Sequence, residues 1–322
     1  MKNPRLIKWR FSRPIAYAVF GVLIYLLFGN RVFSDLNNGF DLTDAEIPID
    51  EIRQGGPPRD GIPAIDNPIF VTAEEAGFLA DEDRVLGLVR GGAARAYPIR
   101  ILDWHEIVND SFGDENVVVS YCPLCGTGMA FDANVDGKSR KFGVSGLLYN
   151  SDVLLYDRES ESLWSQVMRQ SVSGPMKGQG LEQLPMAHTT WRDWRTRHPD
   201  TLVLSTQTGH SRDYSRSPYG GYGTSASIFF PVKNKSPKYH PKELVIGINI
   251  DGSTKAYPFA ELSKGENLFS DSVNGSELRI EFDAANRTGR VLDDKGLEIP
   301  STIAFWFAWY AFYPDTEVYT LN

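Results

Sequence analysis

The two cysteines of the chain, Cys122 and Cys125, share one short stretch, Val117 to Gly126, which reads VVVSYCPLCG. The β-branched residues ahead of Cys122 predict a strand, and the Pro and Gly predict a tight turn that carries both thiols. Two thiols on one short loop can hold one metal ion, or can form and break one disulfide. Each kind of chemistry needs further residues, and these must come from elsewhere in the chain.

The sequence CPLCG is similar to the metal-binding knuckle of zinc ribbons and rubredoxin-like sites. A closed zinc site takes four ligands, so a chain with two cysteines must supply the others from His, Asp, Glu or water. Of the five histidines, His105 is the first candidate and His210, in a loop rich in Gly and Tyr, is the second. We therefore predict a transition-metal site for zinc or copper formed by Cys122, Cys125 and His105, with Glu106 or His210 as an additional ligand.

Two alternatives remain open. The first is a thiol-disulfide oxidoreductase or a cysteine nucleophile, Cys122, activated by His105. The residues after Cys125 are GTGMAFD, which indicate a turn into a strand and not the helix N-terminus that lowers a thiol pKa in thioredoxin-like proteins. The second alternative is a non-catalytic ligand-binding or scaffold module. The residues that would contact its ligand are Trp164, Arg212, Tyr214 and Tyr219.

The elements that must position these residues occur twice. The runs VLGL at residue 85 and AYP at residue 96 return as VIGI at residue 245 and AYP at residue 256. The repeat covers roughly residues 69–132 and 229–293, and in the second copy Asp283 and Asn286 stand where the first has Cys122 and Cys125. Features of one copy alone need a reason other than the fold, which favours chemistry at the cysteines.

Period-two apolar stretches separated by Gly, Asn and Asp turns predict a mainly β (α+β) fold: a single domain with two pseudo-equivalent β-rich halves and short helices. Asp103 and Glu106 have capping-box spacing and predict a helix that begins at Asp103. A long insert is expected over residues 133–228, with a short helix after Thr190 and a strand over residues 201–205. The aromatic run 303–313 predicts a buried helix or strand.

The N-terminal segment has the charge pattern of a signal peptide or signal anchor. Residues 1–33 contain six basic residues and no acid, and within them lies an uncharged, mostly apolar run over residues 15–29. We expect a cytoplasmic basic tip and signal or anchor helix in residues 1–33, a linker in 34–66 and an extracytoplasmic domain in 67–322. The protein would then be single-pass in the cell membrane with its body outside the cytoplasm, or secreted if the segment is cleaved.

The net charge argues against one class of partner. The whole chain carries −8, and without its six N-terminal basic residues the body carries −14. Such a body would repel phosphate backbones, so we expect no nucleic-acid partner. The body is also long enough to bury its own core without disulfides, which disfavours a purely structural role for the two thiols.

Several of these runs together resemble one family. WHEIVND at residue 104, YCPLCGTG at 121, SGLLYNSD at 145 and LWSQ at 163 are similar to the prokaryotic family catalogued as domain of unknown function 3179. The resemblance continues through RDY at residue 212 and FWFAW at residue 305. It implies an N-terminal membrane or export segment, and it implies no particular activity.

Overall fold

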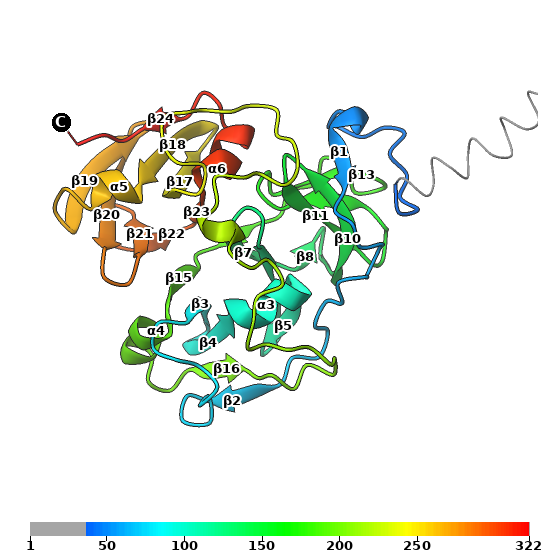
Figure 1. The fold of residues 1–322 in the computed structure, drawn as a ribbon, viewed down its shortest axis with the longest axis horizontal. Coiled ribbons are helices and arrows are strands. Elements are labelled where there is room, and N and C mark those ends of the chain that lie inside the picture. The colour runs from blue at the N-terminus through cyan, green and yellow to red at the C-terminus, as the bar shows by residue number, and fades with distance from the viewer. Residues whose placement is uncertain (1–36, 322) are drawn as a thin grey trace, which may run out of the picture.

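The computed structural model describes residues 37–321, which form a mainly β structure with a few short helices. Five small sheets are arranged like the blades of a propeller, and a two-stranded hairpin accompanies them (Figure 1). The mainly β prediction is confirmed, whereas the arrangement of the sheets was not predicted. The helices are η2 (Ile49–Glu51), α3 (Ile99–His105), α4 (Trp191–Arg197), η3 (Tyr222–Thr224), α5 (Phe259–Leu262) and α6 (Trp306–Phe312).

The first half of the chain builds two sheets. Sheet 1 has the order β15-β3-β4-β16-β2, and sheet 2 has the order β14-β7-β6-β5. The strands of sheet 1 are β2 (Phe70–Thr72), β3 (Arg84–Arg90), β4 (Ala93–Pro98), β15 (Ala187–Thr190) and β16 (Leu202–Leu204). The strands of sheet 2 are β5 (Ile107–Phe112), β6 (Glu115–Cys122), β7 (Thr127–Asp132) and β14 (Gln183–Leu184).

The second half builds two sheets with the same connectivity. Sheet 4 has the order β23-β17-β18-β24, and sheet 5 has the order β19-β20-β21-β22. Gly87 pairs with Ala96 in sheet 1, and Gly247 pairs with Ala256 in sheet 4. The strands are β17 (Leu244–Ile250), β18 (Ser253–Pro258), β19 (Leu268–Val273), β20 (Ser276–Asp283), β21 (Thr288–Leu292), β22 (Glu298–Ile299), β23 (Thr302–Phe305) and β24 (Glu317–Val318).

A tryptophan covers the same glycine in both halves. A Cβ built on Gly87 would lie 2.2 Å from the ring of Trp194, and one on Gly247 would lie 2.3 Å from Trp309. The two indole N–H groups donate equivalent hydrogen bonds, to Thr201 at 2.9 Å and to Thr316 at 3.0 Å. Helices α4 and α6 therefore occupy equivalent places, and the repeated unit includes segments that the sequence assigned to an insert and to a closing aromatic run.

Sheet 3 occurs once. Its order is β1-β10-β11-β12-β13, and most of it is inserted between β7 and β14, where the second half passes directly from β21 to β22. The insert therefore begins at residue 133, as expected, but ends near residue 182 and not near 228. The strands are β1 (Ile52–Gln54), β10 (Phe142–Tyr149), β11 (Asp152–Asp157), β12 (Leu163–Ser165) and β13 (Gln170–Ser173), with the small hairpin β8 (Asn134–Val135) and β9 (Lys138–Ser139) before them.

The segment expected to be a linker packs against sheet 3. Phe40, Leu42 and Ile47 are buried in one cluster with residues of β10 and β11, and Ile52 in β1 pairs with Tyr149 in β10. Apolar side chains at these positions outweigh the Gly and Pro content that suggested a tether. The expected signal or anchor helix in residues 1–33 lies outside the described residues. No helix within residues 37–321 is long and apolar enough to cross a membrane.

The helix expected to begin at Asp103 instead ends two residues later. Pro98 is the N-cap of α3, and Glu106 is its C-cap with a left-handed φ of 58°. Proline fixes a φ suited to a helix start and donates no N–H, so it competes well with an acidic cap. Asp103 and Glu106 are therefore not a capping box. The expected helix after Thr190 is confirmed, because the Thr190 side chain accepts a hydrogen bond from the backbone N–H of Asp193.

Candidate metal centre and adjoining cavity

The two cysteines lie at the turn between β6 and β7. Cys122 pairs with Thr127 across the hairpin, and the N–H of Cys125 donates to the carbonyl of Cys122 at 3.2 Å. Gly126 closes the turn with a φ of +61°, and a Cβ there would lie 2.9 Å from the ring of Phe305. Glycine is required at this position both by the left-handed backbone and by the neighbouring ring. The turn therefore presents both thiols to the interior.

The equivalent turn in the second half shows how the hairpin closes without cysteines. Asp283 pairs with Thr288, and one of its carboxylate oxygens accepts the backbone N–H groups of Ala285 and Asn286. Its other oxygen accepts the Asn286 side-chain amide at 2.7 Å. These hydrogen bonds hold the turn internally. The thiols of the first half are therefore not needed to make the turn.

A hairpin of sheet 3 reaches the thiols. Asn150 and Ser151 have positive φ values of 49° and 69° and connect β10 to β11, which is the backbone of a tight two-residue turn. The carbonyl of Ser151 faces both thiols, with Cys125 Sγ at 3.3 Å and Cys122 Sγ at 3.8 Å. The next residue, Asp152, begins β11 and carries its carboxylate to the same place.

Cys122, Cys125 and Asp152 form one group in which a ligand atom of each lies within 4.8 Å of the others. Such a group could hold a metal ion. One carboxylate oxygen of Asp152 accepts the N–H of Val167 at 3.2 Å, while Oδ1 is buried and accepts no hydrogen bond from the described residues. Unpaired buried polar atoms are costly, and a bound ion would satisfy Asp152.

The environment keeps the thiols protonated when no cation is present. Burial raises the pKa of Cys122 above its ordinary value and raises that of Cys125 well above it. Burial also raises the pKa of Asp152 to about 7. Cys122 is 2% exposed and Cys125 is 0% exposed. A reactive cysteine needs a lowered pKa and access, so the geometry gives little support to the nucleophile alternative.

His105 lies outside the group of three. Its Nδ1 is 2.7 Å from the carbonyl oxygen of Pro63, and its Nε2 is 2.6 Å from the hydroxyl of Tyr214. A carbonyl can only accept, so Nδ1 carries the proton and Nε2 accepts from Tyr214. Burial lowers the pKa of His105 to about 4, so the imidazole is neutral. Nδ1 therefore connects α3 to Pro63, and Nε2 connects it to the loop at Tyr214. His210 is exposed, with its ring centroid 5.3 Å from that of His105.

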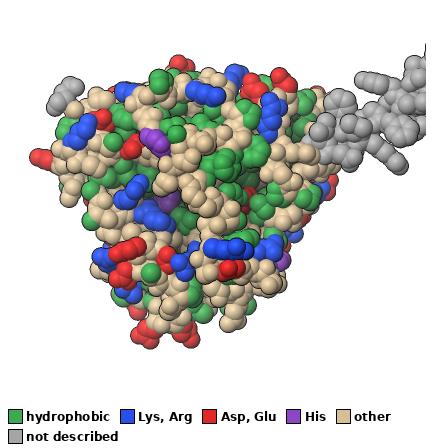
Figure 2. Space-filling view, viewed as in Figure 1, with side chains coloured by type: hydrophobic (Ala, Val, Ile, Leu, Met, Phe, Trp, Pro, Cys, Tyr) green, Lys and Arg blue, Asp and Glu red, His purple; other side chains and the backbone are tan. Residues whose placement is uncertain are grey.

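The predicted ligand-contacting residues separate into two groups. Trp164 is 0% exposed, donates its indole N–H to Asp157 and packs in the core against Phe142. Tyr214 is buried and donates its hydroxyl to Nε2 of His105. Arg212 and Tyr219, by contrast, line a cavity of about 440 Å³ between α3, β10 and the loop that leads to η3. Figure 2 shows hydrophobic side chains reaching the surface in a hollowed part of this face.

The cavity adjoins the cysteine turn. Leu124, between the two cysteines, forms part of its wall, as do Asp103 and Glu106 from α3 and its C-cap. Glu106 is 7% exposed, and one of its carboxylate oxygens accepts the hydroxyl of Tyr219 at 3.1 Å. Its backbone carbonyl accepts the N–H of Tyr121, the residue before Cys122. Burial raises the pKa of Glu106 to about 7 and that of Asp103 to about 6.

These buried acids make stability depend on pH. An acid whose pKa is higher in the folded chain lets the folded state bind more protons, so the free energy of unfolding falls as pH rises. For Glu106 the interval runs from about 4.5 to about 7. In urea unfolding, the free energy of unfolding of the wild type should fall by roughly 3 kcal/mol more than that of Glu106→Gln across this interval. Glu266→Gln, at an exposed position before β19, should follow the wild type. Parallel profiles for wild type and Glu106→Gln would contradict the burial argument.

A family profile matches most of the chain. The family is described as "Protein of unknown function (DUF3179)", and the match covers residues 59–316. The chain belongs to this family. No curated protein and no solved structure matched the chain.

The match to DUF3179 includes both cysteines, Asp152 and all the cavity residues from Gly61 onward. Asp152 ends the run SGLLYNSD that supported the family resemblance, yet no sequence pattern selects it as a ligand. Asp152 is a single carboxylate 27 residues after Cys125. Its distance along the chain from the cysteines matches no common spacing of metal ligands. The signal that could have found Asp152 is the Asn150-Ser151 pair, which predicts a tight two-residue hairpin turn. Asp152 is the first residue after that turn, so the turn sets the position of its side chain.

Proposed function

We propose that this protein binds one transition-metal ion, zinc or copper, through Cys122, Cys125 and Asp152. The observation that carries the proposal is the convergence of three buried ligand atoms with an unsatisfied Asp152 oxygen. Thiolate and carboxylate are suitable ligands for zinc, and thiolates also select Cu(I). Metal binding would keep both thiols ionised, which burial alone opposes.

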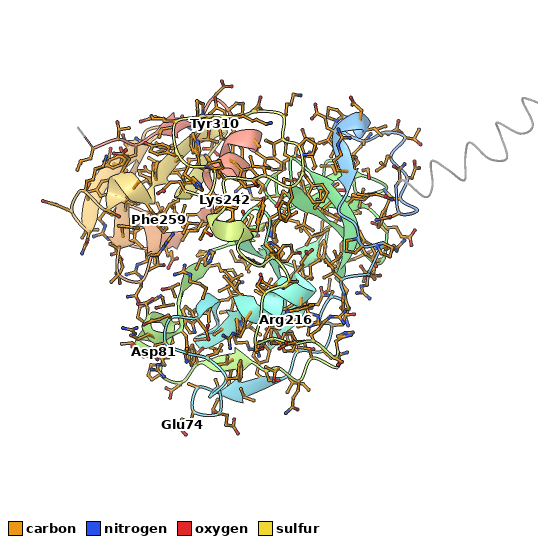
Figure 3. The ribbon with its side chains drawn as sticks, viewed as in Figure 1. Glu74, Asp81, Arg216, Lys242, Phe259 and Tyr310 are labelled. Carbon is orange, nitrogen blue, oxygen red and sulfur yellow. The ribbon has the colours of Figure 1, made fainter. Side chains whose placement is uncertain are left out.

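Charge around the site supports the same proposal. Two thiolates and one carboxylate exceed the charge of a divalent ion by one negative charge. The buried Lys242 places its ammonium 3.8 Å from the ring centroid of Tyr222 and 4.9 Å from that of Phe307, beside η3 (Figure 3). Burial lowers the pKa of Lys242 to about 8, and the charge of Cys125 acts in the opposite direction and raises it, so an ionised Cys125 would favour the charged ammonium. Three protein ligands would leave one position of a tetrahedral ion for water or another molecule.

The test is elemental analysis of the full-length chain, purified with a tag free of histidine and without added metal. We expect about one zinc or copper per chain, as for a single site. Cys122→Ser, Cys125→Ser and Asp152→Asn should each lower the content strongly. His105→Gln should retain the metal, because both ring nitrogens already have partners. Asp283→Asn, at the equivalent turn of the second half, is the matched control and should also retain it.

The same preparation distinguishes the thiol alternative. Absence of stoichiometric metal, together with two thiols that titrate freely in the native protein, would contradict metal binding. A disulfide between Cys122 and Cys125 in protein handled in air would favour the oxidoreductase. Loss of metal in His105→Gln, with the fold intact by circular dichroism, would restore His105 as a ligand.

We also propose that the body lies outside the cytoplasm, held to the membrane by residues 1–33. The basic and apolar order of that segment supports this orientation. The check is the accessibility of the body to protease in cells whose outer layers have been made permeable while the cytoplasmic membrane stays closed. A body protected until the cytoplasmic membrane is lysed would contradict it.

A further inference from the structure

The cavity beside the cysteine turn contains two carboxyl groups that have no cationic partner. Asp103 and Glu106 both line it, and neither makes an ion pair within residues 37–321. The charged groups that act on Glu106 are Asp152 and Asp103, which are both acidic. A carboxylate in apolar surroundings is stabilised most by a nearby positive charge. Arg212 is the cationic residue among those that line the cavity, and it forms no ion pair with Asp103 or Glu106 within residues 37–321.

The walls of the cavity are suited to an apolar body. They include Leu124, Leu148, Phe229 and Phe230, and the volume of about 440 Å³ falls within the range of small-molecule sites. Aromatic rings present a negative face that attracts cations. The rim already shows this preference, because the guanidinium of Arg212 lies 5.9 Å from the ring centroid of Trp104.

We propose that this cavity binds an organic cation, an apolar amine or quaternary ammonium compound, with its charge beside Glu106 and Asp103 and its body against the aromatic and aliphatic walls. The proposal rests on the residues of the cavity and holds whether or not the cysteines bind metal. The hydroxyl of Tyr219 donates to Glu106, which restrains the position of that carboxylate in the cavity wall. An organic anion could pair with Arg212 at the rim, but its apolar part would lie against two acids.

The test is isothermal titration calorimetry of the full-length protein at pH 8 with benzyltrimethylammonium, whose charge does not titrate. Neopentylbenzene is the uncharged compound of the same shape, and phenylacetate is the anionic comparison. We expect the cation to bind at least about tenfold more tightly than either comparison compound. Glu106→Gln and Asp103→Asn should each remove most of that preference, since both keep side-chain size and remove charge.

Glu266→Gln is the matched control, because Glu266 is exposed and does not line the cavity, and it should leave binding unchanged. The Cys122→Ser protein should still prefer the cation, which separates this proposal from metal binding. Equal affinity for cation and neutral compound, tighter binding of phenylacetate, or no binding of the cation would each overturn the proposal. An equal loss in Glu266→Gln and Glu106→Gln would also overturn it.

Discussion

If the proposed ion binds, removing it from the wild-type chain should lower the melting temperature by about 5 °C or more. An unfolding entropy of about 2.1 cal/mol/K per residue over 322 residues makes 1 kcal/mol equivalent to roughly 1.5 °C, so this shift corresponds to a loss of about 3 kcal/mol. Without the ion, Cys122, Cys125 and Asp152 must be buried as neutral groups, and an Asp152 oxygen stays unpaired. An ion bound by Cys122, Cys125 and Asp152 would also join the turn of sheet 2 to the hairpin of sheet 3. The measurement is differential scanning calorimetry before and after treatment with a strong chelator, followed by addition of zinc.

The Cys125→Ser protein provides the comparison that isolates the ion. It should melt near the temperature of chelated wild type, and chelator should shift it no further. Restoration of the melting temperature by zinc should occur in wild type alone. A chelator shift of the same size in both proteins would show that the effect arises away from this site.

Gly87→Ala should destabilise the protein by about 3 kcal/mol, because overpacking a well-packed core costs typically 1–3 kcal/mol and here the obstacle is a large ring. The added methyl would lie 2.2 Å from Trp194, whose side chain is 1% exposed. Trp194 cannot move without losing its hydrogen bond to Thr201. Urea unfolding at constant pH measures the effect.

The second half of the chain allows the same substitution to be tested at the equivalent glycine, Gly247. Gly247→Ala should cost a similar amount, because its methyl would meet Trp309 at 2.3 Å. Gly77→Ala is the control, since a Cβ there meets nothing within 4 Å and alanine also restricts the unfolded chain. A Gly87→Ala protein as stable as Gly77→Ala would mean that the tryptophan does not pack on the strand as described.

Sequence patterns were most informative where both halves carry them. The matched runs around Val85 and Val245 predicted paired strands, and the structure shows those strands with the same register. Helix α6 belongs to the repeat by sequence as well, because the run W-x2-W-x4-P-D-T begins at Trp191 and again at Trp306. The run escaped recognition because its two copies are 115 residues apart, whereas the AYP runs are 160 apart, since sheet 3 is inserted between them. Its second tryptophan covers the glycine of the neighbouring strand in each half.

The candidate site was predictable in its thiols and not in its third member. The spacing of the two cysteines in the sequence identifies them as a pair. Asp152 belongs to a different sheet and reaches the thiols only through tertiary packing. His105 was the natural choice among the histidines, yet the carbonyl of Pro63 and the hydroxyl of Tyr214 engage both of its nitrogens. Residue type alone does not show which hydrogen bonds a buried imidazole has already made.

The single occurrence of sheet 3 has a consequence for the symmetry of the chain. Two identical halves would form a molecule with approximate two-fold symmetry, as a homodimer of one half would. Every surface of such an assembly would appear twice, and neither copy would contain Asp152. Sheet 3 removes that equivalence, because it brings Asp152 to the thiol turn alone, while the turn of the second half is closed by the hydrogen bonds of its own Asp283.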